Sequence, residues 1–67
     1  MDIRRRVGIN LRCARENLGV SQEELADLAG IHRTYISGVE RGVRNPTIIV
    51  LEKIAKALKV KSSALLE

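Results

Sequence analysis

The sequence predicts an all-α domain of five short helices. Three observations favour helices: capping residues precede the candidate segments, apolar residues recur at spacings of three and four, and no segment shows the alternation typical of a strand. The 67 residues include a single aromatic side chain, Tyr35, so the core must be built from leucine, isoleucine, valine and alanine. A chain of this length has room for one domain, which we expect to cover residues 1–67.

Polar and glycine residues mark the ends of the first two predicted helices. Asp2 can cap the first helix, and Gly19 supplies the left-handed residue that ends it. Ser21 and Glu24 form a capping box in front of a second helix, expected over residues 22–29. The apolar stripe of the first helix consists of Ile3, Val7, Leu11, Ala14 and Leu18.

Similar signals predict three further helices. Gly30 stops the second helix, and a third is expected to begin within two or three residues and to end near Arg41. Thr47 can cap a fourth helix, and Ser62 can start a last short one. The expected core stripe of the fourth helix consists of Ile48, Leu51, Ala55 and Leu58.

The second and third predicted helices have the spacing of a helix-turn-helix pair. Such a pair needs a small residue where the helices cross, glycine in the turn and aliphatic residues in the angle between the helices. Ala26 is the small residue and Gly30 lies in the turn. The aliphatic residues are Leu25, Ala29, Ile31, Ile36 and Val39. The alternative, an ordinary helical hairpin without a ligand, leaves the polar face of the third helix unexplained.

The outward face of the third helix carries arginine and small polar residues instead of the paired Lys and Glu of a solvated helix. Arg33, Thr34 and Ser37 lie on this stripe together with Gly38 and Arg41. The DNA major groove admits an α-helix, where arginine can bind guanine and Thr or Ser can contact base edges. We therefore expect Arg33, Thr34 and Ser37 to read bases of double-stranded DNA. The alternative is that they only cap and solubilise the helix.

The charge distribution also favours a polyanionic partner. The net charge is +4, and basic residues are concentrated near the N-terminus and in the third predicted helix and the loop after it. The adjacent arginines Arg4, Arg5 and Arg6 can follow DNA phosphates or simply be solvated. The longest aliphatic run, residues 48–51, is far too short to cross a membrane.

The remaining composition argues for a cytoplasmic protein without catalytic activity. No signal peptide is evident, and the single cysteine, Cys13, is expected to be a buried or half-buried hydrophobe in a reducing compartment. His32 is the only histidine, and there are no paired carboxylates, metal-ligand clusters or phosphate-binding glycine loops. We expect no cofactor, metal or small-molecule ligand. His32 is expected to cap the third helix or to contact a phosphate.

The run SQEELADLAGIHRTYISGVERGVRNP resembles the helix-turn-helix regulators of the lambda and lambdoid phage repressor and Cro type, the Xre-like family. The resemblance covers nearly the whole chain, and HRTYISGVERGVRNP is similar to the controller proteins of restriction-modification systems. It implies a five-helix, lambda-repressor-like domain with its third helix in the major groove. It also implies a transcriptional regulator that binds a palindromic operator as a homodimer.

The resemblance assigns further residues to the DNA backbone. Gln22, at the start of the second helix, and Arg44 and Asn45, in the loop after the third, match family positions that contact phosphates. Gln22 can alternatively be a plain exposed residue. Tyr35 borders the polar and apolar stripes, so a phosphate contact by its hydroxyl and plain packing are equally expected.

Glu40 lies on the inward stripe of the third helix, where an unpaired carboxylate would be costly. It therefore needs a cation. The family pattern pairs this glutamate with an arginine of the first helix, which corresponds to Arg15. The alternative is a local contact with Arg41 or Arg44. We expect the pair with Arg15, which would tie the first helix to the third.

The last two helices carry more aliphatic residues than one face can bury. Exposed aliphatic surface usually forms an interface, and the resembled family dimerises through these helices. The expected interface residues are Ile49, Val50, Ile54, Leu65 and Leu66. A two-fold dimer would place its third helices about 34 Å apart, one turn of DNA. The alternative is that all these residues fit inside a single core.

A protein-binding module, such as an antitoxin that masks a partner, is the alternative function. In that case the aliphatic C-terminal surface would carry the activity, and Arg33 would not. RNA binding is disfavoured because a single aromatic residue offers no stacking platform.

Overall fold

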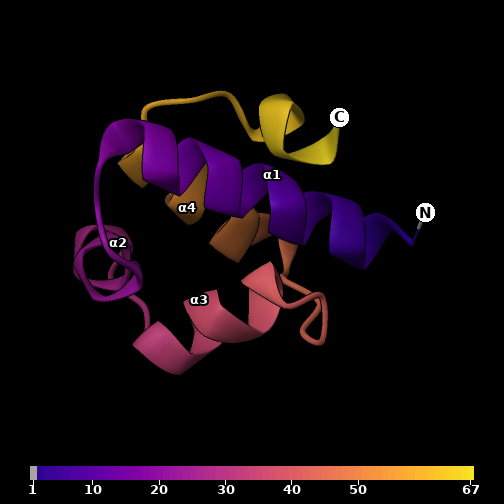
Figure 1. Cartoon of the computed structure of the whole chain (residues 1–67), viewed down its shortest axis with the longest axis horizontal. Helices are drawn as coiled ribbons and strands as arrows, with labels where there is room; N and C mark the ends of the chain where they lie inside the picture. The colour runs from indigo at the N-terminus through magenta and orange to yellow at the C-terminus, as the bar shows by residue number, and fades with distance from the viewer. Residues whose placement is uncertain (1) are drawn as a thin grey trace.

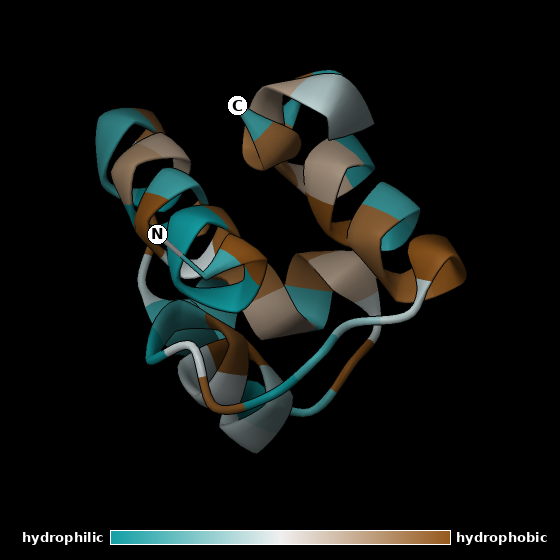
Figure 2. Ribbon diagram, turned by 90° about the vertical axis from the view of Figure 1, so that its right-hand side faces the viewer, coloured by the Kyte–Doolittle hydropathy of each residue, from teal (hydrophilic) through white to brown (hydrophobic). Residues whose placement is uncertain are grey.

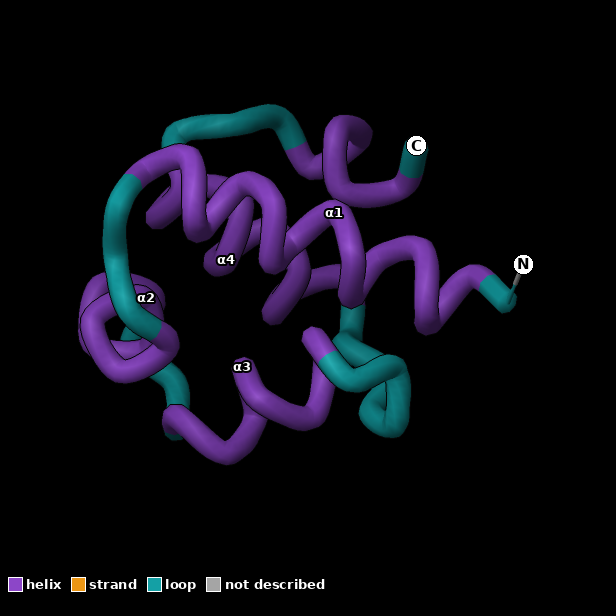
Figure 3. Tube along the Cα trace, in the orientation of Figure 1, coloured by secondary structure: helices purple, strands orange, loops and turns teal. Residues whose placement is uncertain are grey.

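The computed structural model describes residues 2–67 and confirms the predicted all-α class, with four α-helices and a final 3₁₀ helix in this range (Figure 1). The elements are α1 (Ile3–Leu18), α2 (Gln22–Ala29), α3 (Arg33–Glu40), α4 (Ile48–Leu58) and η1 (Ser62–Leu66). Short loops join them, the longest of which connects α3 to α4 (Figure 3). Across the described residues, no helix combines the length and apolar character that a membrane span requires.

The predicted capping residues begin these helices. Ser21 Oγ accepts a hydrogen bond from the backbone N–H of Glu24, and the Glu24 carboxylate accepts one from the backbone N–H of Ser21. Thr47 Oγ1 accepts the backbone N–H of Val50 at 3.1 Å, and Asp2 caps α1. The caps satisfy backbone donors that have no partner inside the helix. They explain why the helix starts were readable from the sequence.

The helices enclose one aliphatic core. α1 packs against α3 on one side and η1 on another, while α2 packs against α3 and α4 (Figure 1). Figure 2 shows brown, hydrophobic residues on the inner sides of the helices and teal, hydrophilic residues over much of α1. The buried core side chains are Val7, Leu11, Leu25, Ala26, Ile36, Val39, Leu51, Ile54, Ala55, Leu58 and Leu65.

The turn between α2 and α3 has the expected construction. Gly30 adopts a left-handed conformation with φ 71°, which glycine takes without steric cost. Ala26 is 2% exposed where the helices cross, and Ile36 and Val39 are fully buried on the inner side of α3. This packing fixes which side of α3 faces outward.

A close helix crossing was not evident from the sequence. α1 crosses the C-terminal end of α3 at Gly8, where an added Cβ would lie 2.5 Å from the carbonyl oxygen of Val39 and 2.6 Å from that of Glu40. Both contacts are to backbone atoms, so neither can move aside easily. Only glycine permits α1 to approach α3 this closely.

Two expectations about burial were wrong. Ile48, assigned to the core stripe of α4, is 85% exposed because the first turn of α4 projects beyond the core. Figure 2 shows this turn as a brown end at the right of the molecule. Cys13, expected to be at least half-buried, is exposed on α1. Near the ends of the α1 stripe, Ile3 is 45% and Leu18 36% exposed.

Candidate nucleic-acid interface

The start of α3 is organised by His32. Its Nδ1 accepts the backbone N–H of Thr34 at 3.2 Å and lies 2.8 Å from Thr34 Oγ1. His32 therefore caps α3, which was one of its two expected roles. The contact also fixes the rotamer of Thr34 and leaves that exposed side chain at the beginning of the outward face.

The structure places the three predicted base-contacting residues on the outward side of α3. Arg33 and Thr34 are exposed, and Ser37, one turn further along, is half-buried. The opposite side is held by Ile36 and Val39, which are buried in the core. The orientation of the polar face therefore follows directly from the packing of the apolar one.

Gly38 is not on the open part of that face, contrary to expectation. It is buried, and the covering atoms belong to Arg44 in the loop after α3. The backbone N–H groups of Val43 and Arg44 both donate to the carbonyl oxygen of Gly38, at 3.0 and 3.2 Å. The loop therefore folds back onto the last turns of α3.

Arg44 and Tyr35 are brought together at the edge of this face. The guanidinium carbon of Arg44 lies 4.9 Å from the centre of the Tyr35 ring, a cation–π arrangement. Tyr35 is half-buried, so its ring covers the edge of the core and also supports the arginine. Asn45, the next residue in the loop, is exposed and lines a hollow with Ile3 and Ile48.

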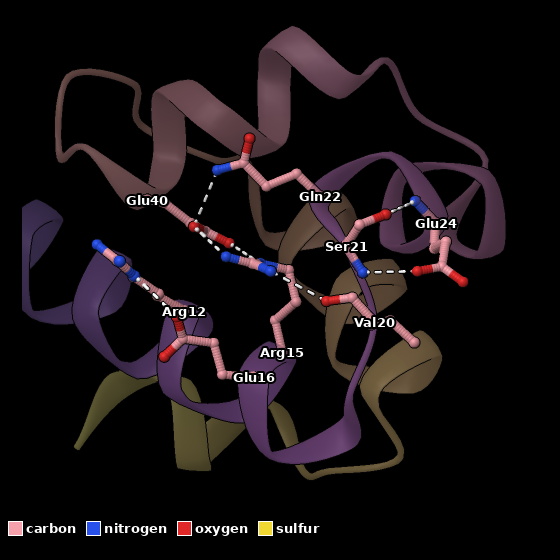
Figure 4. A network of polar contacts seen from close by, with 8 residues as sticks. All are labelled: Arg12, Arg15, Glu16, Val20, Ser21, Gln22, Glu24 and Glu40. Atoms are coloured by element: carbon pink, nitrogen blue, oxygen red, sulfur yellow. Dashed lines mark hydrogen bonds and ion pairs between the residues drawn. The ribbon is translucent and has the colours of Figure 1, made fainter.

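Behind α3, the carboxylate of Glu40 pairs with Arg15 (Figure 4). Arg15 Nε lies 2.6 Å from Glu40 Oε2 and Arg15 Nη2 lies 3.2 Å from Glu40 Oε1. The hydrogen bonds from Arg15 to this carboxylate raise the pKa of Arg15. The Glu40 side chain is only 4% exposed, so an unpaired charge there would be poorly solvated. Neither Arg41 nor Arg44 pairs with it among the described residues.

Gln22 joins this network instead of being a plain exposed residue. Its Nε2 donates to Glu40 Oε1 at 3.0 Å, while Arg15 Nη1 donates to the carbonyl oxygen of Val20 (Figure 4). One carboxylate thus links α1, α2 and α3. The sequence did not reveal the contact of Gln22 with Glu40, because spacing within one helix carries no information about a partner on another. The second N–H of the Gln22 amide remains available at the N-terminus of α2.

In the described part of the chain, three arginines form ion pairs with carboxylates, whereas those of α3 and the following loop do not. Arg4 pairs with Asp2 at 2.9 Å and Arg12 with Glu16 at 3.2 Å, and Arg15 pairs with Glu40. Within residues 2–67, no carboxylate lies within 4 Å of the arginines of α3 and the following loop, which are Arg33, Arg41 and Arg44. Among the described residues, these three arginines therefore form no direct ion pair.

The N-terminal arginines are also separated by the structure. Arg5 lies against the loop after α3, because an added Cβ at Gly42 would be 3.0 Å from Arg5 Cγ and 3.3 Å from Arg5 Cα. Gly42 itself has φ 75°. Arg4 is instead held by Asp2 at the end of α1.

Two of the five residues expected at the dimer interface are buried, so the prediction was wrong for them. Ile54 is 0% exposed and Leu65 is 1% exposed, because both point into the core of their own chain. They cannot offer surface to a partner without unfolding. Ile49 is 72% and Leu66 44% exposed, and Val50 is half-buried. The sequence prediction missed the exposed Ile48, which lines an apolar hollow that also includes Ile3, Val7, Leu51 and Leu66.

A capped helix with a polar, arginine-bearing outward side, packed on a second helix across a glycine turn, defines a helix-turn-helix domain. The sequence pattern of the HTH_3 family, described as helix-turn-helix, matches residues 11–65. The chain belongs to this family. Its relatives include an HTH-type transcriptional regulator and two control proteins.

The chain and its fold are similar to those of known regulators. Control protein C.SmaI of Serratia marcescens is 46% identical over 66 residues, which are 98% of this chain and 79% of the relative. A solved structure of a hypothetical transcription factor from Neisseria has a TM-score of 0.95 and 45% identity, covering 98% of this chain and 76% of that one. The restriction-modification controller protein C.AhdI from Aeromonas hydrophila has a TM-score of 0.90 and 42% identity, covering 92% and 94%. These similarities confirm the resemblance stated from the sequence.

Proposed function

We propose that this protein binds a palindromic operator in double-stranded DNA as a homodimer, with α3 of each protomer in the major groove. The observation that carries the proposal is the outward side of α3. It combines exposed polar side chains with arginines that form no ion pair within residues 2–67, and buried residues on the opposite side anchor it in the core. Similarity to two restriction-modification control proteins favours a role as such a controller.

Arg33, Thr34 and Ser37 are the proposed base readers. Arg33 is exposed at the start of α3 and forms no ion pair within residues 2–67, so its guanidinium is available to the N7 and O6 atoms of a guanine. Thr34 is oriented by His32, which leaves its methyl group and an oxygen lone pair for the neighbouring base. Ser37 follows one turn later on the same side.

Gln22, Tyr35, Arg44 and Asn45 are the proposed phosphate contacts. Gln22 lies at the N-terminus of α2, where backbone N–H groups also favour an anion. Arg44 and Asn45 lie at the other end of the α3 face, in the loop. The two groups would hold the DNA backbone on both sides of α3 and so fix its register in the groove.

The proposed dimer interface is the exposed aliphatic surface formed by Ile48, Ile49, Val50 and Leu66. These residues lie at the first turn of α4 and at the end of η1. Burying them between two protomers would remove an apolar surface from water. A two-fold arrangement would then present two copies of α3 to two half-sites of a palindrome.

Selection of bound duplexes from random DNA, followed by binding measurements on single variants, tests this proposal. Arg33→Ala is expected to weaken binding to the selected operator by about tenfold or more while affecting random DNA little. Arg44→Ala should weaken binding to both and flatten the salt dependence by about one unit. Lys56→Ala, which removes one exposed charge from α4, is the control for net charge.

Two outcomes would contradict the proposal. One is that selection yields no preferred sequence over bulk DNA. The other is that Arg33→Ala weakens binding to operator and random DNA by the same factor, since a phosphate contact would behave in that way.

A further inference from the structure

We propose that Gly38 is a positioning residue: it lets the Arg44 side chain lie flat across α3 and so preforms a contact with a DNA phosphate. This inference rests on the proposed function, in which Arg44 contacts the DNA backbone. It assigns a role to a glycine that the helical pattern alone leaves unexplained.

The backbone of α3 does not itself require glycine at this position. Gly38 lies inside a regular helix and is absent from the residues with positive φ, which include Gly19, Gly30 and Gly42. Glycine is less favourable than alanine in the interior of a helix. The reason for Gly38 must therefore lie in the atoms that cover it.

Those atoms belong to the Arg44 side chain. An added Cβ at Gly38 would lie 3.2 Å from Arg44 Cβ, 3.4 Å from Arg44 Nε and 3.7 Å from Arg44 Cδ. The arginine stem therefore runs directly over the space that a side chain at Gly38 would occupy. A methyl group there would require the arginine stem to shift outward by a few tenths of an ångström.

The same arginine is held at both ends. Its backbone N–H donates to the carbonyl oxygen of Gly38 at 3.2 Å, which fixes the start of the side chain. Its guanidinium lies 4.9 Å from the centre of the Tyr35 ring, one turn back along α3. The Arg44 side chain thus packs along Gly38 and the Tyr35 ring. It forms no ion pair with a carboxylate of residues 2–67.

An arginine held in this way is already ordered before DNA arrives. A long side chain that becomes immobilised only on binding loses conformational entropy, and this loss lowers affinity. Arg44 avoids part of this loss. Gly38 would act only through Arg44, without touching the DNA itself.

Gly38 differs in this respect from Gly8. At Gly8, an added Cβ would meet backbone carbonyl oxygens of α3, and the helices would have to separate. At Gly38, it would meet only side-chain atoms of Arg44, at 3.2 Å or more, which need to shift by a few tenths of an ångström. We therefore expect Gly38→Ala to keep the fold, with an unchanged or higher thermal midpoint, and to displace Arg44.

A double-mutant cycle of Gly38→Ala and Arg44→Ala tests the proposal, with binding measured on operator and on random duplex DNA. Gly38→Ala alone is expected to weaken binding to both by a similar factor of about threefold to tenfold. In the Arg44→Ala background it should cause no further loss, because the residue through which it acts is gone. A merely structural role of Gly38 would lower the thermal midpoint and weaken binding in both backgrounds.

The phosphate contact of Arg44 and the positioning role of Gly38 can be refuted separately. If Arg44→Ala leaves affinity and salt dependence unchanged, the phosphate contact of the proposed function is wrong, and the role of Gly38 fails with it. If Arg44→Ala weakens binding but Gly38→Ala is fully additive with it, only the role of Gly38 is overturned.

A second route to the same contact does not depend on how Gly38→Ala folds. Tyr35→Leu removes the ring under the guanidinium, whereas Tyr35→Phe keeps the ring and removes only the hydroxyl. The difference in affinity between these two variants should be present with Arg44 and absent with Arg44→Ala. An equal difference in affinity in both backgrounds would show that the Tyr35 ring does not act through Arg44.

Discussion

Glu40 is the residue on which the geometry of the interface depends most. Its nearly buried carboxylate accepts two hydrogen bonds from Arg15 and one from Gln22. These contacts join α1 and α2 to the end of α3, immediately beside the loop that carries Arg44. A buried carboxylate is tolerated only with such partners.

Replacement of Arg15 with alanine is expected to destabilise the fold by about 3 kcal/mol, because it leaves the Glu40 charge buried without its main partner. Urea unfolding of Arg15→Ala measures this loss. Arg12→Ala, which breaks only the exposed pair with Glu16, serves as the control and should cost less than about 1 kcal/mol. Equal losses for the two variants would show that the Glu40 pair does not tie the helices together.

At the residue scale, local signals were predictable and non-local contacts were not. The His32 cap and the Arg15 pair were expected from helix chemistry and from the family pattern. Gly38 was assigned to the outward face because helical periodicity places it there. The sequence contains no signal that Arg44, in the following loop, folds back over Gly38. Helical periodicity shows which residues share a face of one helix, but not which other segment packs on that face.

At the scale of elements, the start of α1 depends on one exposed carboxylate. The Asp2 side chain accepts the backbone N–H of Arg4 at 2.8 Å and pairs with the Arg4 guanidinium at 2.9 Å. The side-chain hydrogen bonds from Arg4, followed by the backbone one, lower the pKa of Asp2 from 3.8 to about 2. Asp2 thus favours the folded state in its ionised form.

The stabilising contribution of Asp2 should therefore disappear in acid. Because its pKa is lower in the folded state, the contribution is complete above pH 3.8 and is lost as the pH falls through about 2. Thermal midpoints of the wild type and Asp2→Ala should converge over this range. Glu52→Ala controls for the loss of an exposed carboxylate, and a difference between the wild type and Asp2→Ala that stays constant from pH 5 to about pH 2 would contradict the cap.

The elements themselves were predictable because their ends are chemically marked. Ser21 with Glu24, Thr47 and the glycine at position 30 set helix boundaries that the structure reproduces. The approach of α1 to α3 at Gly8 was not predictable, because a glycine within a helix does not indicate which other helix packs against it. The packing of η1 was not predictable either. Asn10 holds it by donating hydrogen bonds to the main-chain oxygens of Leu65 and Glu67.

At the scale of the whole molecule, the surface is divided between the proposed DNA contact and the proposed dimer interface. The arginines without an ion pair in residues 2–67 lie on α3 and its loop, whereas the most exposed aliphatic residues, Ile48 and Ile49, lie at the first turn of α4, with Leu66 at the end of η1. The sequence prediction of the interface was partly wrong, since a run of aliphatic residues does not reveal which of them face inward. Ile54 and Leu65 do so here.

Ile49→Glu is expected to prevent dimerisation without unfolding the chain, because this side chain is 72% exposed in the single protomer. A charge placed in an apolar interface is costly, so the dimer should weaken by at least about tenfold. Sedimentation velocity measures this change. Leu28→Glu, at another exposed position on α2, is the matched control. A variant at Ile49 that sediments as the wild-type dimer would exclude this surface as the interface.

Methylation of guanine N7 in the selected operator tests whether the outward side of α3 reads bases in the major groove. An arginine that binds guanine through N7 and O6 is blocked by a methyl group at N7. We expect that methylation of one guanine in each half-site blocks binding of the wild type, and that Arg33→Ala no longer responds to methylation of that guanine. Wild-type binding that tolerates N7 methylation throughout the operator, or an interference pattern that Arg33→Ala leaves unchanged, would contradict this expectation.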